Sequence, residues 1–325
     1  MIGCTYITLF IGLALLVSVG SAAVFTNEDT RIESSQSINP IVMKANQATA
    51  VMIDQWYIKE QNNGTLKISS ASLKKIYNTC DDEKFADQIT AGKCSGVLIG
   101  SDLILTAGHC MIHNECDNHN WIFNYEIKKA KKNKIVIDRN FSYRCKEVVT
   151  LRYFYDIMQD DYAIVRLDRP VKNINPVKFS SNSYFNFIAS EEKINFFSIT
   201  SPSGIPKKIS ENLYLIKSLH SSEDNLEFKK DDLYRLSRNW GKLFITSAFA
   251  DGSSGGPIFD SIDGTLVGIV VAIHSESFLE IMTSAGTCMR SPIFKIDLGL
   301  NNSQTVPDYA SAAIQPIESI PLDFY

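Results

Sequence analysis

The sequence lacks a strong charge imbalance, an apolar run of membrane-spanning length and the C-x-x-C spacing of common zinc sites. Its formal net charge is −4 over 325 residues, which gives no reason to expect nucleic acid or an anionic membrane as a partner. Without closely spaced thiols we expect no metal site. The chain is 45% hydrophobic and 21% charged. This composition excludes a disordered protein and can bury a sizeable core.

One apolar run lies near the start of the chain. It extends from Ile7 to Val19, 13 residues, whereas a helix needs about 20 residues to span a bilayer. Small residues follow it up to Ala23, although the Lys or Arg expected before such a run is missing. The order predicts a secretory signal peptide over residues 1–23 and a mature protein that is secreted, either extracellular or periplasmic.

A glycine-rich turn carries a serine at the centre of the sequence G-S-S-G-G-P, residues 252–257. A serine hydroxyl needs a base within hydrogen-bond reach to act as a nucleophile, and backbone N–H groups must converge on the oxyanion that forms. Glycines allow that close approach of the backbone. Because glycine and serine clusters are also common in ordinary turns, Ser254 is a candidate nucleophile only if a base accompanies it.

A candidate base and a candidate acid lie upstream of this turn. His109 closes an apolar strand pattern within T-A-G-H-C, residues 106–110, and Asp161 precedes the strand pattern Y-A-I-V-R-L. The T-A-G-H-C and S-S-G-G-P segments resemble those of the trypsin-like, chymotrypsin-fold serine peptidases. The order His, Asp, Ser matches that family as well.

The resemblance implies an all-β fold of two packed six-stranded antiparallel β-barrels. In that family the histidine and the aspartate come from the first barrel and the serine from the second, and the substrate cleft lies between them. Many short strand-like runs separated by turns, between residues 103 and 296, agree with an all-β architecture.

The resemblance also implies roles for single residues. Ser254 attacks the peptide carbonyl, His109 moves the proton and Asp161 orients His109. The amides of Gly252 and Ser254 bind the oxyanion. Asp160 is the rival orienting acid, but adjacent side chains of a strand point to opposite faces, and Asp161 fits the register of the family. This chemistry needs no metal or organic cofactor.

For the primary substrate pocket, the resemblance places Ala248 and Phe249 at the floor. It places Val271 in the strand that forms the pocket wall and His274 directly after that strand. Cleavage after Arg or Lys needs a buried carboxylate, which these positions lack. Cleavage after Glu needs a wall histidine where Val270 stands. We therefore expect an uncharged, apolar side chain at the primary substrate position.

The cysteines indicate an oxidising compartment, because removal of Cys4 with the signal peptide leaves six cysteines, an even number. The expected disulfides are Cys94–Cys110, Cys116–Cys145 and Cys80–Cys288. The first is implied by the resemblance, which places it beside the base. Cys116 and Cys145 bracket a hairpin-like segment, and Cys80 and Cys288 are the two cysteines that remain. Other pairings of these last four cysteines stay open.

Three further segments resemble the bacterial secreted, glutamyl-endopeptidase-like branch of the family, namely residues 24–31, 85–110 and 201–206. We therefore divide the chain into a signal peptide over 1–23, an N-terminal extension or pro-segment over 24–84, a protease domain over 85–300 and a C-terminal tail over 301–325.

These residues together predict a secreted serine endopeptidase that acts on protein or peptide substrates, without a nucleic-acid partner and without a membrane partner after signal cleavage. The alternative is a catalytically silent binding protein that keeps the fold. Such proteins usually lose a member of the catalytic triad, and none is missing here. The oligomeric state is left open by the sequence.

Overall fold

The computed structural model describes residues 24–26, 28–127, 134–153, 160–188, 192–216, 219–221, 226–228, 237, 241–246, 248–273, 279–284, 286–294, 306–307 and 311–322. The expected signal peptide, residues 1–23, and His274 lie outside these ranges. No helix within them is long and apolar enough to cross a membrane.

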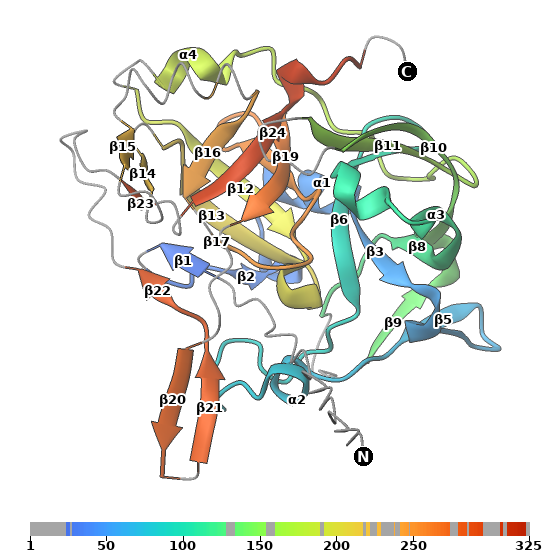
Figure 1. The fold of residues 1–325 in the computed structure, drawn as a ribbon. Coiled ribbons are helices and arrows are strands. Elements are labelled where there is room, and N and C mark those ends of the chain that lie inside the picture. Colours follow the sequence, from blue (N-terminus) through green and yellow to red (C-terminus); the bar gives the residue numbers. More distant parts are fainter. Residues whose placement is uncertain are drawn as a thin grey trace, which may run out of the picture.

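Six antiparallel strands close into the first barrel (Figure 1). In barrel order they are β10 (Ser142–Tyr153), β11 (Asp161–Leu167), β7 (Leu103–Thr106), β6 (Gly92–Leu98), β3 (Thr49–Asp54) and β8 (His119–Ile122). Val97, Trp121 and Ile164 belong to one buried cluster and are at most 1% exposed. Closure leaves the barrel itself without a free sheet edge.

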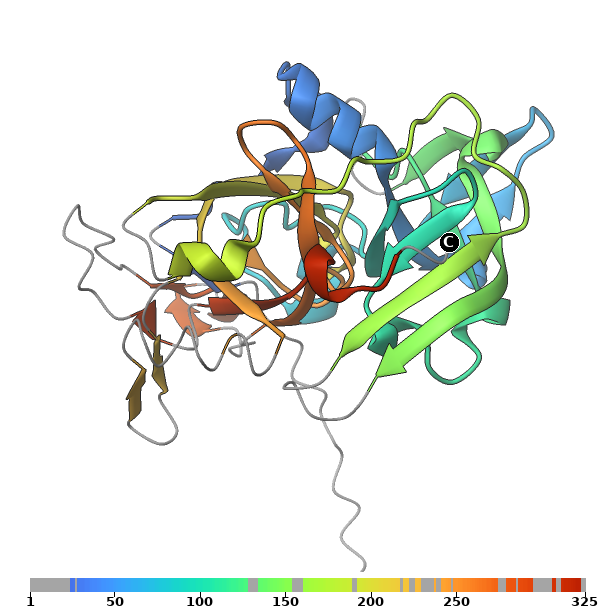
Figure 2. The ribbon, with the colours of Figure 1, turned by 90° about the horizontal axis from the view of Figure 1, so that it is seen from above.

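Seven strands form the second sheet, which lies beside the first barrel (Figure 2). Their order is β16 (Leu243–Thr246), β24 (Ser311–Pro316), β19 (Leu266–Ile273), β18 (Pro257–Asp260), β12 (Asn195–Thr200), β13 (Lys208–Tyr214) and β2 (Ile32–Glu33). The sheet curls until its sides meet, since Leu215 forms a bridge with Ile245. The all-β chymotrypsin-like fold is therefore confirmed, but among the described residues the second sheet closes through short contacts between residues 214–216 and β16, and not through a full pairing of two strands.

Smaller elements surround the two barrels. β4 (Ile58–Glu60), β5 (Thr65–Ile68) and β9 (Ile135–Asp138) form one small sheet, and β1 (Val24–Thr26), β17 (Ala248–Phe249) and β22 (Ile293–Phe294) form another. A third contains β14 (Leu219–Ser221), β15 (Leu226–Phe228) and β23 (Val306–Pro307). The α-helices of the described residues are α1 (Pro40–Ala48), α2 (Leu73–Tyr77), α3 (Glu115–Asn118) and α4 (Tyr184–Ile188).

The expected domain limits need correction at both ends. β3 lies in the stretch that we expected to be an extension, yet it pairs with β6 and β8 inside the closed barrel. β24 lies in the expected tail, yet all of its residues are buried and it pairs with β16 and β19. Its sequence S-A-A-I-Q-P has little apolar periodicity, so its burial follows from the neighbouring strands and not from its own pattern.

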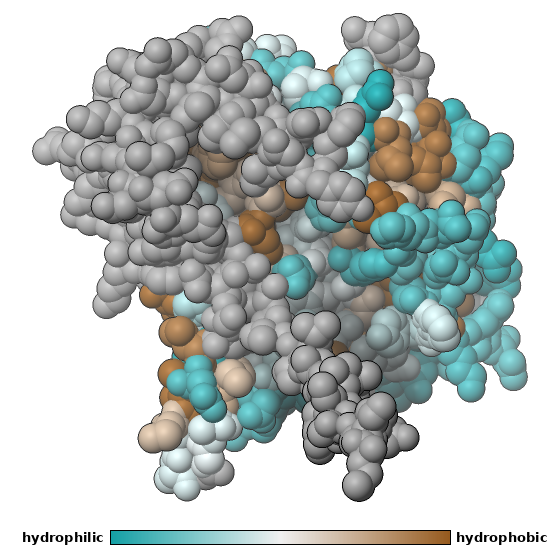
Figure 3. All heavy atoms as spheres, in the orientation of Figure 1, coloured by the Kyte–Doolittle hydropathy of each residue, from teal (hydrophilic) through white to brown (hydrophobic). Residues whose placement is uncertain are grey.

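The structure contains the three expected disulfides, Cys94–Cys110, Cys116–Cys145 and Cys80–Cys288. The last of them ties the chain after α2 to the hairpin of β20 (Leu279–Thr283) and β21 (Gly286–Arg290), which projects from the body (Figure 1). This hairpin exposes the apolar side chains of Leu279 and Met282, and its surface mixes apolar and polar residues (Figure 3).

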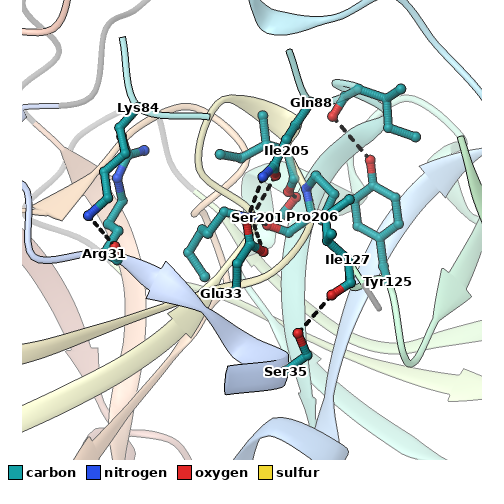
Figure 4. A network of polar contacts seen from close by, with 12 residues as sticks. Arg31, Glu33, Ser35, Lys84, Gln88, Tyr125, Ile127, Ser201, Ile205 and Pro206 are labelled. Atoms are coloured by element: carbon teal, nitrogen blue, oxygen red, sulfur yellow. Dashed lines mark hydrogen bonds and ion pairs between the residues drawn. The ribbon is translucent and has the colours of Figure 1, made fainter. Parts of the chain in front are cut away.

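A buried ionic network attaches the segment that contains β2 to the second sheet (Figure 4). Lys208 of β13 is 0% exposed. Its Nζ donates to Glu33 Oε2 over 3.1 Å and to Gln88 Oε1 over 2.8 Å. Burial lowers the pKa of the Lys208 ammonium to about 8, although the carboxylate of Glu33 opposes this effect. The ion pair therefore compensates a charge that burial disfavours.

Glu33→Gln is expected to lower the free energy of unfolding by about 3 kcal/mol at pH 6, because it leaves a buried ammonium without its charged partner. This loss should shrink as the pH rises through about 8, where Lys208 loses its proton in the folded protein even with Glu33 present. The unfolded chain keeps that proton up to the ordinary lysine pKa in both proteins, so its titration cancels in the comparison.

Urea unfolding at a series of pH values checks this prediction. Glu28→Gln, which alters an exposed carboxylate of the same segment, is the control and should not change the stability. Equal stability of Glu33→Gln and the control at pH 6 would contradict the expected role of the ion pair.

Candidate active site

His109 lies in the short 3-10 helix η3 (Gly108–Met111) that follows β7. A side chain at Gly108 would not fit, because its Cβ would lie 2.0 Å from the Arg152 carbonyl oxygen. The backbone N–H of His109 donates to Asp161 Oδ1 over 2.9 Å, and the ring Nδ1 lies 2.7 Å from Asp161 Oδ2. Both carboxylate oxygens of Asp161 therefore hold one residue, through its backbone and through its ring.

Asp161 is the first residue of β11, where it pairs with Tyr153 of β10. Its side chain is 12% exposed, against 28% for the side chain of His109. The neighbouring Asp160 has a different partner, since its Oδ1 accepts from the Gln315 amide over 3.4 Å. The structure thus brings Asp161 and not Asp160 to His109, in agreement with the alternation of side chains along a strand.

Backbone N–H groups of the turn at residues 252–256 hold it in place. The N–H of Gly256 donates to the Ser253 carbonyl over 2.8 Å, and the N–H of Gly255 donates to the Val270 carbonyl of β19 over 2.7 Å. The N–H of Ser253 donates within the same loop, over 2.9 Å. In the part of the chain that the structure describes, the other two amides of the turn, those of residues 252 and 254, have no protein acceptor.

Two glycines let this turn pack against both barrels. Gly252 has a φ of +88° and Gly255 a φ of +75°, the left-handed region that favours glycine. A Cβ at Gly252 would lie 2.4 Å from the Ser201 carbonyl oxygen. One at Gly255 would lie 2.1 Å from Thr106 Oγ1 of β7. Neither position can therefore carry a side chain without a shift of the backbone.

Ser254 lies beside the disulfide that contains the residue after His109. The Ser254 carbonyl oxygen accepts from the Ser95 N–H over 2.8 Å and lies 3.8 Å from Cys110 Sγ. Ser254 and His109 are both partly exposed, whereas Ser253 and Cys110 beside them are buried. The structure thus places the backbone of the candidate nucleophile next to the residue that follows the candidate base, at the junction of the two barrels.

This place is not a metal site. A ring nitrogen of His109 and the sulfur atoms of Cys94 and Cys110 lie within 4.8 Å of one another. The two sulfur atoms are joined in a disulfide and offer no thiolate to a metal ion.

The expected pocket residues are apolar and buried next to the turn. Ala248 and Phe249 form β17 and are 5% and 0% exposed. Val271 of β19 is 5% exposed. The residue before the candidate nucleophile, Ser253, is also buried, and its Oγ lies 3.2 Å from Thr200 Oγ1. None of these residues carries a charge.

The sequence interpretation missed two polar residues that hold the site together, Ser95 of β6 and Gln315 of β24, both 0% exposed. Ser95 Oγ donates to the Gly252 carbonyl over 2.8 Å. Gln315 Oε1 accepts from the Asp161 N–H over 3.2 Å. Neither residue has a local signal in the sequence that would have identified it. Their partners lie 157 and 154 residues away along the chain.

Comparison with solved structures finds distant likenesses. The Rv3671c protease of M. tuberculosis H37Rv, in an inactive form, is 12% identical with a TM-score of 0.40, covering 82% of this chain and 93% of that chain. The HtrA-type protease AlgW with a decapeptide is 14% identical with a TM-score of 0.43, covering 88% and 65%. Human heparin binding protein is 10% identical with a TM-score of 0.42, covering 84% and 87%. These likenesses carry no argument about function.

The family comparison is more direct. No curated protein matches the sequence. The family model described as the trypsin-like peptidase domain matches residues 94–269, which is more than half of the chain and includes the three candidate residues of the site. The match names the family and no branch within it, so the resemblance to the glutamyl-endopeptidase-like branch is not confirmed. The chain belongs to the trypsin-like peptidase domain family.

Proposed function

We propose that this protein is a secreted serine endopeptidase, with residues 1–23 as its signal peptide and Ser254, His109 and Asp161 as its catalytic residues. The observation that carries the proposal is the 2.7 Å contact between His109 Nδ1 and Asp161 Oδ2. A buried aspartate that holds Nδ1 leaves Nε2 for the serine hydroxyl. Membership of the peptidase family supports peptide-bond hydrolysis, and the three disulfides support an oxidising compartment.

The reaction proceeds through an acyl-enzyme. His109 Nε2 takes the proton of Ser254 as Oγ forms a bond to the peptide carbonyl carbon, and Asp161 stabilises the resulting imidazolium. The N–H groups of Gly252 and Ser254, which have no acceptor among the described residues, donate to the oxyanion. His109 then gives its proton to the leaving amine. Water then attacks the ester carbonyl while His109 takes a proton from it. His109 returns this proton to Ser254 Oγ, and the acid product is released.

The first prediction concerns these catalytic residues. Ser254→Ala or His109→Ala should lower kcat by about six orders of magnitude, and Asp161→Asn by about 10⁴, because an asparagine no longer selects the correct tautomer of the imidazole. The exposed Asp117→Asn is the control and should leave kcat unchanged. Asp160→Asn should cost much less than Asp161→Asn, and the reverse order would show that the orienting acid is misassigned.

A second measurement separates an enzyme from a silent binding protein. A serine-directed phosphonate should label the wild-type protein at residue 254 and leave Ser254→Ala unlabelled, because only an activated serine reacts with it. Absence of labelling in a folded wild-type protein would favour the silent binding protein. N-terminal sequencing of the labelled chain tests cleavage after Ala23.

We also propose that the primary pocket prefers an uncharged, apolar side chain. Ala248, Phe249 and Val271 are buried and apolar. A substrate arginine or lysine among them would bury a cation without a partner, which costs several kcal/mol. Profiling on a peptide library measures this preference. A preference of about a hundredfold or more for Arg, Lys or Glu, roughly 3 kcal/mol, would contradict the proposed pocket.

A further inference from the structure

A buried glutamine lies directly behind Asp161. Gln315 Oε1 accepts two hydrogen bonds, from the Asp161 N–H over 3.2 Å and from Lys242 Nζ over 2.7 Å. Its Nε2 donates to Ser319 Oγ over 2.6 Å and to Asp160 Oδ1 over 3.4 Å. Two donors meet the oxygen and two acceptors meet the nitrogen, so only one orientation of the amide satisfies all four contacts.

Lys242 brings a positive charge to the same place. It precedes β16 and is 1% exposed. Burial lowers the pKa of its ammonium, and the carboxylates of Asp160 and Asp161 oppose this effect. A buried cation is costly unless negative charge compensates it, and these two acidic residues supply such charge.

The arrangement crosses the junction between the barrels. Asp161 begins β11 of the first barrel, whereas Gln315 lies on β24 of the second sheet and Lys242 directly precedes β16, the strand next to it. The main chain that carries the orienting acid is therefore held from the opposite barrel. Because the three groups are buried together, a hydrogen bond lost here leaves a polar atom without water to replace its partner.

We propose that Gln315 and Lys242 are positioning residues for catalysis: Gln315 keeps Asp161 in line with His109, and Lys242 limits the negative charge that acts on His109. The inference rests on the proposed roles of Asp161 and His109. Adjacent carboxylates without a nearby cation would favour the imidazolium form, and a histidine that is already protonated cannot take a proton from Ser254.

Other charges near His109 do not replace this effect among the described residues. On β10, the Tyr153 ring lies 6.1 Å from the His109 ring, and the side chain of Arg152 is exposed. On α3, Glu115 is already paired with a lysine and a histidine. Among the described residues, the charged groups on the Gln315 side of Asp161 are therefore the Asp160 carboxylate and the Lys242 ammonium.

The test of Lys242 separates its charge from its hydrogen bond. Lys242→Gln removes the charge but keeps a donor toward Gln315, whereas Lys242→Arg keeps the charge. The His109 imidazole is titrated by NMR in each protein, and kcat and KM are measured on one peptide across the same pH range. The exposed Lys172→Gln is the matched control for loss of one lysine charge.

We expect Lys242→Gln to shift the titration of His109 and the acidic limb of kcat/KM upward together, because the variant removes a positive charge from the Gln315 side of Asp161. KM should stay the same, and Lys242→Arg and Lys172→Gln should keep the wild-type titration. An unshifted His109 titration in Lys242→Gln would overturn the role of Lys242. The NMR readout needs no turnover, so a wild type that hydrolyses no peptide would contradict the proposed function and still leave this role tested.

The test of Gln315 uses Gln315→Met, which keeps the length of the side chain and removes its hydrogen bonds. We expect kcat to fall about tenfold with KM within about twofold of the wild type, because misalignment affects the transition state more than ground-state binding. An unchanged kcat, or a loss in KM alone, would overturn its positioning role. If the urea midpoint shows that Gln315→Met does not fold, Gln315→Asn, which keeps the amide but withdraws it from the Asp161 N–H, replaces it with the same expected fall in kcat and the same result that would overturn the role.

Discussion

The arrangement of the candidate active site depends on the contacts that Ser95 makes across the junction of the two barrels. Its N–H donates to the Ser254 carbonyl and its Oγ to the Gly252 carbonyl, over 2.8 Å in both cases. The Ser95 carbonyl in turn accepts from Thr106 Oγ1 over 2.7 Å. Ser95 and Thr106 are 0% exposed, so a lost hydrogen bond at either residue would leave a polar atom without water to replace its partner. One residue of β6 therefore fixes the serine turn of the second sheet against the strand that leads to His109.

Buried lysines hold other distant segments together in the same way. Lys207 is 0% exposed, and its Nζ donates to the carbonyls of Asn46 and Thr49, which joins the second sheet to the end of α1. Lys208 and Lys242 do the same for the segment of β2 and for β24. Burying an ammonium costs more than its pairing returns in many proteins, so such contacts favour one arrangement of the chain more than they add stability.

Much of the site could be predicted from the sequence, because its residues lie in short local segments with strict requirements. Gly108, Gly252 and Gly255 allow no side chain where they lie, and this restriction makes the segments around His109 and Ser254 recognisable. The disulfide between Cys94 and Cys110 follows from the same segments. The domain limits were wrong, because β3 and β24 are strands of the two sheets and only their neighbours show it.

The sequence by itself determined the fold class, the disulfide Cys94–Cys110 and the candidate triad, since each depends on residue types in short recognisable segments, whereas the pairing of the other four cysteines came from the tertiary structure. Only the tertiary structure decided which acid faces His109 and what lies behind it. Gln315 and Lys242 are 73 residues apart in the chain. Gln315 is 154 residues from Asp161, and Lys242 lies between these two residues in the sequence. Ordinary polar residues have no local signature. Gln315 and Lys242 come together with Asp160 and Asp161 only because two sheets bury them at one place, where each buried polar group must find a partner.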